Sequence, residues 1–470
     1  MENILYDFNK KITSLVENYL KNLLFTKGIS EFTEDLVKEF AEFGSSLTQY
    51  LIDVTEKTIF ELKERKEDFE SLEKDERTVI SIFGEVNFKR RYYLDKEKNE
   101  KVYLLDKVLK IIPKERLLEN VQEKLISEAV VTSYENAGEK AAYNTKISRQ
   151  EVKNEIEKLD LTKDFYEETK DKKKIEYLYI IADEDHVHLQ KGGIEEPRIV
   201  IVYENAISTG KRIELKNKRH FGGLYKHKID DLWEEVASYI EGNYDIDYLK
   251  KVFIQGDGAS WIKTGKEWIL KSEYVLDEFH MTKAVNAIVG RITKENKKEQ
   301  IENKRKLYYS IKKFDFKGFK ENCYDILSEE MDKTLRKRKE QNMNYILNNI
   351  EGIRNLYQNQ ELLHGCSAEG HVSHIYSDRM SSRPMGWKSE NINNMSKLRL
   401  LKEDNVSVKE ILSKQGKVID FEEYREIREK TKKKINKNID FKPVQIPIME
   451  FGTHEQKEMF RAILREKVAI

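Results

Sequence analysis

Hydrophobic positions in the first part of this chain recur at helical spacing. Between residues 5 and 69 apolar side chains return every three or four positions, as in Leu15 and Tyr19, and few helix breakers interrupt them. This period places apolar side chains on one face of a helix. The pattern therefore predicts a helical N-terminal region over residues 1–76, which we expect to serve packing or protein contacts rather than direct DNA binding.

The pattern changes in residues 77–161, where extended and helical segments are combined. Two β-rich runs on either side of Gly84 are typical of a hairpin. Three helices are expected after residue 117, and Ser133 and Ser148 stand where helix N-caps are favoured. The last two have the proportions of a helix-turn-helix, whose second helix binds the DNA major groove. Such helical pairs are also common in proteins that do not bind DNA.

A charge-dense stretch, residues 162–174, precedes a block in which strands and helices alternate. Apolar runs predict three consecutive strands within residues 175–221, a helix over 229–242, and then strands alternating with helices. A meander followed by parallel crossovers is the order of a ribonuclease H-like α/β fold. We therefore expect residues 174–281 to form the first part of such a core.

The remaining segments complete the predicted organisation. Residues 282–360 are again helical and are expected to be an insertion in the core, which residues 361–400 then complete. Residues 401–470 are expected to form a basic C-terminal tail. The predicted fold class is α/β, with a ribonuclease H-like core, a helical insertion and a mainly helical N-terminal DNA-binding region, since 470 residues exceed what one core usually fills.

Charge adds information only through its distribution. Because 85 basic residues balance 85 acidic ones, net charge by itself predicts no nucleic-acid partner. However, residues 291–340 carry 16 Lys or Arg against 10 Asp or Glu, whereas residues 1–80 carry 11 against 18. The balanced total thus hides a basic segment, which favours contact with a nucleic-acid backbone.

Cysteine usage and hydropathy restrict the class of protein. Only Cys323 and Cys366 occur, which excludes a disulfide framework and any zinc finger built on cysteine pairs. The chain has neither a leader pattern nor an apolar run of 18 residues. We expect a cytoplasmic, nucleoid-associated protein without a membrane partner.

Carboxylates follow two of the predicted strands. Asp183 ends the first strand, with Asp185 on the same face as a possible substitute, and Asp257 ends the fourth. These two strands would be neighbours in the sheet, so Asp183 and Asp257 should face one another. Mg²⁺ prefers carboxylate oxygens, and a pair of such ions supports phosphoryl transfer. The alternative for each residue is an ordinary turn or strand-end Asp.

A third candidate acid, Glu369, comes after the predicted insertion, in a segment where a helix could return it to the core. Zinc bound by His371, His374 and either Glu369 or Cys366 is a rival interpretation, although the spacing matches no standard zinc site. His280, after the fifth strand, could bind a scissile phosphate or could be a buried, hydrogen-bonded histidine. The alternating pair His186 and His188 is, like the zinc candidates, either a pair of metal ligands or a pair of plain hydrogen-bonding groups.

Basic and polar side chains cluster near three predicted DNA-binding elements. Some interleave with aromatic residues in the second hairpin strand, which is also the pattern of an ordinary edge strand. Others begin the second helix of the helix-turn-helix or lie in a polar loop anchored by Trp387. The candidates are Lys89, Arg90, Arg91, Arg149, Gln150, Lys153, Asn154, Arg379 and Arg383.

The motifs around the candidate acids carry a resemblance to a known family. They are IADEDHV from Ile181, QGDGA from Gln255, DEFH from Asp277, SAEGHV from Ser367 and SDRMSSRPMGW from Ser377. In these motifs the chain resembles the ISLre-type transposases of bacterial insertion sequences, which are similar to Mutator-like enzymes. The likeness covers nearly the full length.

This resemblance implies that Asp183, Asp257 and Glu369 are the triad of a DDE transposase that depends on Mg²⁺ or Mn²⁺. It implies that His280 belongs to the motif after the second Asp, where Asp277 replaces the usual Cys. The expected partners are double-stranded DNA, as element ends and target, and further copies of the chain in a homo-oligomer. Alternatives are a ribonuclease H-like nuclease without strand transfer, a domesticated DNA-binding descendant and a zinc hydrolase.

Overall fold

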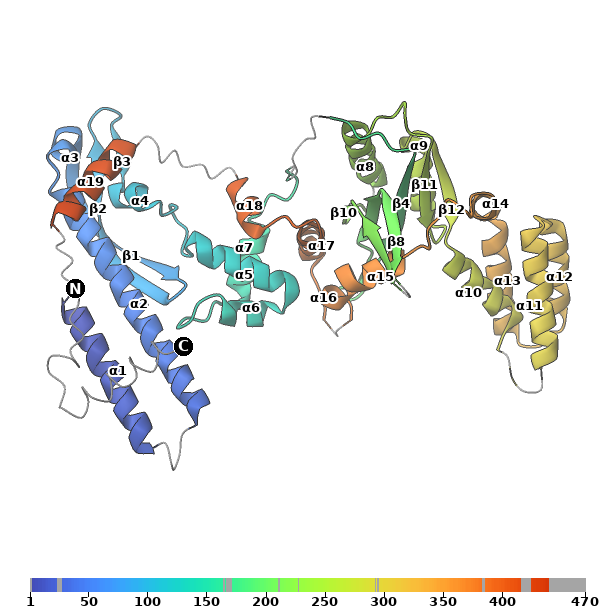
Figure 1. Cartoon of the computed structure of the whole chain (residues 1–470), viewed down its shortest axis with the longest axis horizontal. Coiled ribbons are helices and arrows are strands. Elements are labelled where there is room, and N and C mark those ends of the chain that lie inside the picture. The colour runs from blue at the N-terminus through green and yellow to red at the C-terminus, as the bar shows by residue number, and fades with distance from the viewer. Residues whose placement is uncertain are drawn as a thin grey trace, which may run out of the picture. The chain divides into compact units, whose positions relative to one another are not determined.

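The computed structural model describes residues 2–22, 28–163, 165, 171–209, 212–226, 228–291, 293, 296–382, 385–415 and 424–438. It shows a mixed α/β protein, which confirms that part of the predicted fold class (Figure 1). The chain divides into two compact units, one made of residues 1–158 and 415–470 and the other of residues 159–414. Each unit has a sheet of its own.

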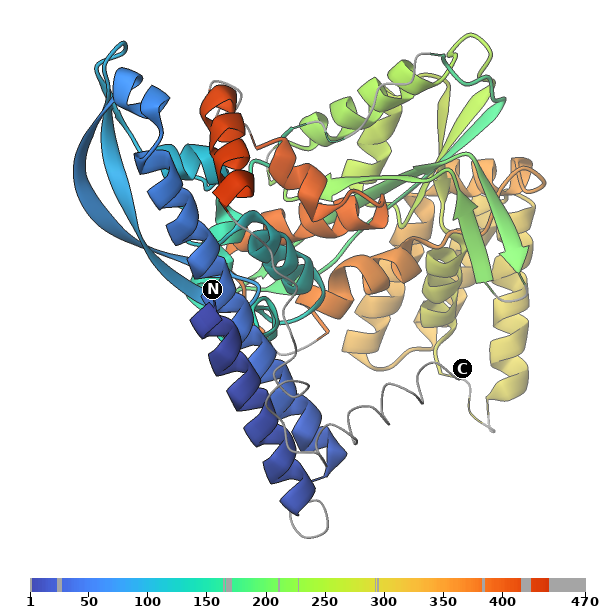
Figure 2. The same cartoon turned by 60° about the vertical axis from the view of Figure 1, so that its left-hand side comes forward.

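The first unit begins with two long helices, α1 (Glu2–Asn22) and α2 (Ile29–Phe60). They lie side by side as an antiparallel pair (Figure 2). Phe8 of α1 stacks on Phe43 of α2 with ring centroids 4.2 Å apart. After α3 (Lys63–Asp68), the chain becomes extended at Phe69, so the predicted helical region ends earlier than residue 76.

A three-stranded antiparallel sheet follows, with β1 (Phe69–Ser81), β2 (Gly84–Asp95) and β3 (Glu100–Val102) in that order. The predicted hairpin at Gly84 is confirmed, and Gly84 has a φ of +125° that suits glycine in the tight turn. The core under this sheet combines residues from α2, β1, β2 and α4 (Leu104–Leu109). Ile427 of α19 (Arg425–Asn438) joins it from far along the sequence.

The three helices predicted after residue 117 are present as α5 (Glu119–Val131), α6 (Tyr134–Lys140) and α7 (Arg149–Glu157). Ser133 and Ser148 cap α6 and α7, accepting hydrogen bonds from backbone N–H groups at 3.2 Å in both cases. The loop between them is fixed to the β1–β2 turn, because Thr145 Oγ1 accepts a hydrogen bond from Glu85 N at 3.2 Å. The helices therefore pack with the hairpin in one unit.

The second unit contains a five-stranded sheet in the order β10-β7-β4-β11-β12. The first three strands in sequence, β4, β7 and β10, pair antiparallel, whereas β11 and β12 continue parallel to β4. Their bounds are β4 Tyr177–Glu184, β7 Arg198–Tyr203, β10 Arg219–Gly223, β11 Lys251–Gly256 and β12 Ser272–Leu276. Two small hairpins stand outside this sheet: β5 (Val187–His188) with β6 (Ile194–Glu195), and β8 (Asn205–Thr209) with β9 (Arg212–Lys216).

Helices alternate with the later strands, as predicted. They are α8 (Ile229–Asn243), α9 (Ser260–Trp268) and α10 (Glu278–Val289). The fifth strand of the sheet, β12, ends at Leu276, because Asp277 accepts a hydrogen bond from Phe279 N at 3.0 Å and starts α10. The last of the three strands predicted within residues 175–221 is divided into two: Arg212–Lys216 pairs within the β8–β9 hairpin, and Arg219–Gly223 forms β10 of the sheet.

The predicted helical insertion is present as α11 (Lys297–Lys312), α12 (Phe316–Ser328), α13 (Lys333–Leu347) and α14 (Ile350–Gln358). Short helical turns follow: α15 (Ala368–Val372), a π-helical turn (Ser373–Ser377) and α16 (Asp378–Met380). The unit ends with α17 (Ser389–Glu403), which packs on β10, and α18 (Val408–Ser413). Within the described part of the chain, no helix has the length and apolarity needed to cross a membrane.

A buried carboxylate in the first unit, that of Glu56, makes the free energy of unfolding depend on pH. Glu56 of α2 is 6% exposed, its Oε1 accepts a hydrogen bond from Arg91 N at 3.1 Å, and its Oε2 is buried without a hydrogen-bond partner. Burial raises the pKa of Glu56 from its ordinary 4.5 to about 7. The folded protein therefore binds this proton more tightly than the unfolded chain does, and its stability falls as pH rises from about 4.5 to 7.

Replacing Glu56→Gln should remove this pH dependence. We expect the free energy of unfolding of the wild type to fall, relative to the variant, by about 3 kcal/mol between pH 4.5 and pH 8. Urea unfolding at a series of pH values measures the difference. Glu76→Gln, on the exposed edge of β1, is the control and should run parallel to the wild type. Parallel curves for wild type and Glu56→Gln would contradict the assignment.

Candidate active site

The structure brings Asp183 and Asp257 together at one edge of the second sheet. Asp183 lies at the end of β4 and Asp257 directly follows β11, and these strands are parallel neighbours in which Ile181 pairs with Gln255. Burial, and then the nearby charge of Asp257, raise the pKa of the Asp183 carboxyl to about 7. Two carboxyl groups therefore share a partly buried position, where their mutual repulsion is weakly screened.

The loop that carries Asp257 is held from two sides. Its Oδ1 accepts a hydrogen bond from Ala259 N at 2.9 Å, and Gly258 adopts a φ of +95° that favours glycine. The end of α13 supplies the other support, because the Tyr345 hydroxyl donates to the Asp257 carbonyl. Asn349, which is 3% exposed, lies so close that a Cβ on Gly258 would be 2.5 Å from its Oδ1. The insertion thus fixes the position of Asp257.

His280 lies on the first turn of α10, near the acidic pair. Its Nδ1 is 2.9 Å from Asp277 Oδ2, and this hydrogen bond raises the pKa of His280, with smaller contributions from the charges of Asp257 and Asp183. Asp277 therefore both caps α10 and orients the imidazole. The sequence left the role of Asp277 open, and the signal for it was an N-cap aspartate three residues before a histidine.

Glu369 is not gathered with the other two acids. It lies on α15, which packs against β4, but its own side chain is exposed. Among the residues that the structure describes, no three His, Cys, Asp or Glu side chains are close enough to hold one metal ion. The geometry thus assembles two of the three predicted acids.

Asp185 has a partner of its own. The Ser381 hydroxyl lies 3.0 and 2.8 Å from its two carboxylate oxygens, and His186 N donates to Oδ1 at 2.9 Å. The predicted substitute for Asp183 therefore links the end of β4 to the segment after α16. This arrangement directs its carboxylate to a hydroxyl donor.

The histidines proposed for zinc also lie apart from a common site. Burial, together with the nearby positive charge of Lys218, lowers the pKa of His371 to about 4, while His374 is exposed and burial raises the pKa of the Cys366 thiol. His186 and His188 are exposed as well. In the described ranges these side chains form no metal-binding group.

Two of the three residues of β2 that were predicted to contact DNA instead contact other side chains of the first unit. Arg90 pairs with Asp106 and lies 3.5 Å from the ring centroid of Tyr103. Arg91 lies 3.7 Å from the centroid of Phe60. These two arginines therefore stabilise the sheet, whereas Lys89 is exposed and 3.1 Å from Glu76.

The predicted contacts on α7 are placed differently. Arg149, Gln150 and Asn154 are exposed, whereas Val152 and Ile156 of the same helix are buried. Intramolecular pairs engage them too, since Arg149 pairs with Glu135, Gln150 donates to Asn154 at 2.7 Å, and the half-buried Lys153 lies 2.7 Å from Glu157. The exposed face of α7 keeps the polar character that a recognition helix needs.

Of the two arginines predicted to contact DNA from the polar loop, the structure describes one. Arg379 is 5% exposed, and its guanidinium lies 4.9 Å from the ring centroid of Trp387. It therefore helps to pack the loop that Trp387 anchors, which was the alternative interpretation of this segment. Arg383 lies outside the described residues.

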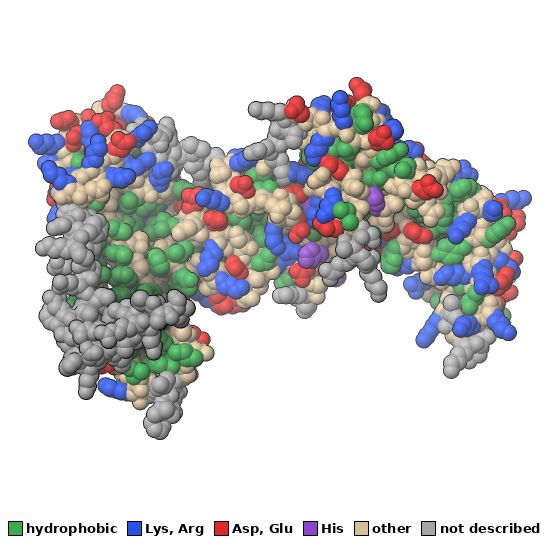
Figure 3. Space-filling view, in the orientation of Figure 1, with side chains coloured by type: hydrophobic (Ala, Val, Ile, Leu, Met, Phe, Trp, Pro, Cys, Tyr) green, Lys and Arg blue, Asp and Glu red, His purple; other side chains and the backbone are tan. Residues whose placement is uncertain are grey.

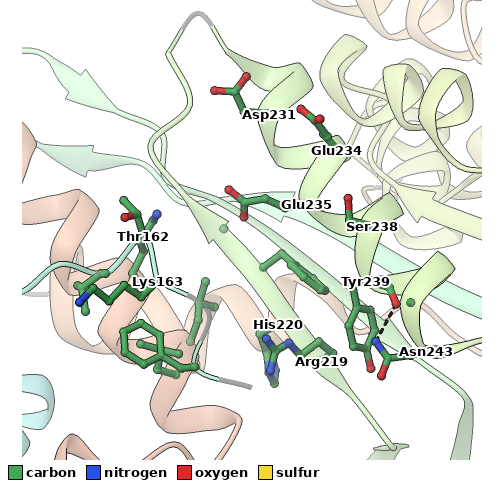
Figure 4. Close-up of a pocket in the computed structure, with 18 residues that line it drawn as sticks. Thr162, Lys163, Arg219, His220, Asp231, Glu234, Glu235, Ser238, Tyr239 and Asn243 are labelled. Carbon is green, nitrogen blue, oxygen red and sulfur yellow. Dashed lines mark hydrogen bonds between the residues drawn. The ribbon is translucent and has the colours of Figure 1, made fainter. Parts of the chain in front are cut away.

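A cavity of about 880 Å³ lies elsewhere in the second unit, between α8, β10 and α17. Asp231, Glu234 and Glu235 project from α8 on one side, and Lys163 and Arg219 lie on the other (Figure 4). Burial raises the pKa of Glu235, whose carboxylate accepts a hydrogen bond from the Tyr225 hydroxyl. None of the predicted catalytic residues lines this cavity.

The fold and the site define a mixed α/β protein with an acidic pair at the carboxyl ends of two parallel strands. The chain belongs to the uncharacterised protein family UPF0236, which it matches over residues 21–416. One UPF0236 protein of Caldanaerobacter subterraneus subsp. tengcongensis is 35% identical over 405 residues, which cover 86% of this chain and 84% of the relative. A second from the same organism is 34% identical over 424 residues, with the same coverage.

These relatives occur in many copies. The name of the first joins eleven loci of one genome, and other members of the family are encoded in the same genome. Many paralogues in one genome are compatible with a family that is associated with mobile elements.

The contact between Asp277 and His280 can be tested directly. Asp277→Asn should lower the pKa of His280, because the amide cannot stabilise the imidazolium as the carboxylate does. NMR titration of the histidine ring carbons measures this, with His280→Gln to assign the resonance. Asp247→Asn, an exposed substitution, is the control. An unchanged pKa in Asp277→Asn would contradict the pairing.

Proposed function

We propose that this protein is a metal-dependent DDE transposase of a bacterial insertion sequence. In this proposal it binds the terminal inverted repeats of its element and catalyses DNA cleavage and strand transfer. The observation that carries the proposal is the placement of Asp183 and Asp257 side by side at the ends of β4 and β11. Phosphoryl transfer by paired metal ions requires carboxylates brought together in this way from separate elements.

The sheet supports a ribonuclease H-like core. Three consecutive strands pair antiparallel, and two further strands extend the sheet parallel to the first of them, on its other side. Helices connect the parallel strands. This order is the one expected from the sequence for a ribonuclease H-like fold, and it places the first and fourth strands next to each other.

The acidic pair suits a divalent cation. Two partly buried carboxyl groups side by side repel each other when both are ionised. Burial raises the pKa of Asp183, and the charge of Asp257 raises it further. A cation between them would relieve the repulsion, and oxygen donors favour Mg²⁺ or Mn²⁺. When bound, such ions would polarise the phosphate and lower the pKa of an attacking water.

The roles of the protein side chains follow from their positions. Asp183 and Asp257 would hold the cation, and His280, whose protonated form Asp277 stabilises, would offer an N–H donor to a phosphate oxygen. Glu369 enters the proposal as third ligand through the family resemblance, and this role requires α15 to carry the exposed side chain toward Asp183. DNA at the element ends would be bound through α7 and the basic insertion, by a homo-oligomer that pairs the two ends.

Removing the acids should abolish catalysis without abolishing DNA binding. We expect Asp183→Ala, Asp257→Ala and Glu369→Ala each to reduce strand transfer of an end oligonucleotide by at least about 1,000-fold, since each removes a direct metal ligand. Gel-based strand-transfer and end-binding assays on the same preparations separate the two steps. Asp247→Ala, at an exposed position of the same unit, is the matched control.

Each outcome of that assay has a distinct meaning. Unchanged cleavage by Asp257→Ala would refute the assignment of the acidic pair. Full activity of Glu369→Ala alone would leave the pair intact and remove Glu369 from the triad. A wild-type protein that cuts the end but does not join a pre-cut 3′-hydroxyl end would be a nuclease rather than a transposase.

Metal binding can be followed without activity. Mn²⁺ or Mg²⁺ should raise the melting temperature of the wild type, because a ligand that binds only the folded state stabilises it by about 2.7 kcal/mol at 100 times its Kd. The double variant Asp183→Asn with Asp257→Asn should lose this metal-dependent shift, and Asp247→Asn should keep it. An equal shift in all three proteins would place the metal elsewhere.

A further inference from the structure

Helix α11 of the insertion presents a face of basic and aromatic side chains to solvent. Its other side, with Leu307, Ser310 and Ile311, is buried. The exposed face lines a shallow groove of about 370 Å³. The residues that line this groove, called here the α11 face, are Ile301, Lys304, Arg305, Tyr308, Tyr309 and Lys312.

The aromatic residues of the α11 face are not needed to fill a core. Tyr309 is 66% exposed, which leaves most of its ring available to a partner. Tyr308 is held in place, since its hydroxyl donates to Thr282 at 2.9 Å and the Lys304 ammonium lies 5.9 Å from its ring centroid. A large exposed ring beside a fixed one is a surface that a planar group can stack on.

The charges of the α11 face have no carboxylate partner among the described residues. Within the part of the chain that the structure describes, Lys304, Arg305 and Lys312 form no ion pair. Basic positions also recur about seven residues apart along the helix, at Lys298, Arg305 and Lys312, a spacing of about 10.5 Å on one side. Figure 3 shows lysine and arginine side chains over α11 and α12, with acidic ones among them.

We propose that the α11 face binds single-stranded DNA, with the cations on phosphates and Tyr309 stacked on a base. A positively charged groove combined with exposed aromatic rings is the arrangement that binds unpaired strands without sequence preference. Duplex DNA would use the cations but not the ring, because its bases are stacked on one another. The inference rests on the proposed function in taking DNA as the ligand, yet it concerns a surface separate from Asp183 and Asp257.

The test compares the two forms of DNA with the full-length protein. Fluorescence anisotropy with a labelled 30-nucleotide oligo(dT), and with a labelled 30-base-pair duplex, gives Kd at several salt concentrations. Tyr309→Ala should weaken oligo(dT) binding by about fivefold or more and leave duplex binding within about twofold, since stacking is lost only for unpaired bases. Tyr309→Phe keeps the ring and should bind as the wild type does, and the retained duplex binding of Tyr309→Ala excludes a folding defect.

Charge removal gives a second, independent readout. The double variant Arg305→Gln with Lys312→Gln loses two phosphate contacts. The slope of log K against log salt concentration for oligo(dT) binding should therefore become less steep by about 1.4. Lys317→Gln with Lys320→Gln removes the same charge from the exposed side of α12 and should leave that slope unchanged.

Specific results would overturn the inference. These are unchanged oligo(dT) affinity in Tyr309→Ala, an equal loss for duplex and oligo(dT), or an equal effect of the α12 control. Asp183→Asn with Asp257→Asn should bind oligo(dT) as the wild type does. Loss of catalysis in that variant therefore tests the proposed function, whereas loss of binding in Tyr309→Ala tests the α11 face.

Discussion

The parallel pairing of β4 with β11 is the constraint on which the candidate site depends. Ile180 and Ile254 are opposite one another in this pairing and are fully buried, so apolar packing and the backbone ladder fix the two strands together. Because parallel strands end at the same edge of the sheet, the pairing forces the carboxylates that follow them into proximity. The stability of the sheet therefore holds Asp183 and Asp257 close together despite the electrostatic repulsion between their carboxylates.

The helical insertion contributes to the site as well as to the surface. The end of α13 reaches the loop after β11, where Tyr345 holds the Asp257 carbonyl and Asn349 occupies the space left by Gly258. Gly352 brings α14 close to β12, where a Cβ would lie 2.8 Å from Leu276 N. The end of α13 and the start of α14 are thus attached to the core beside the acidic pair.

Basic and aromatic residues occur together in both β2 and α11, but their basic side chains are paired with acids in β2 and exposed to solvent on α11. In β2, Arg90 meets Asp106 of α4 and Arg91 meets Glu56 of α2, so both are consumed by the packing of the first unit. On α11, Arg305 and Lys312 meet no such acid in the described residues and stay in solvent. Local sequence could not separate these cases, because the acids that decide them come from other elements.

What the sequence alone determined is the local structure: helical periods, the Gly84 hairpin, the caps at Ser133 and Ser148, and the strands that end near acids. These features depend on side chains a few residues apart, which the chain order displays directly. The tertiary structure decided which acids meet. It joined Asp183 to Asp257, turned Asp185 to Ser381 and left Glu369 exposed, because these contacts depend on the packing of elements that are distant in sequence.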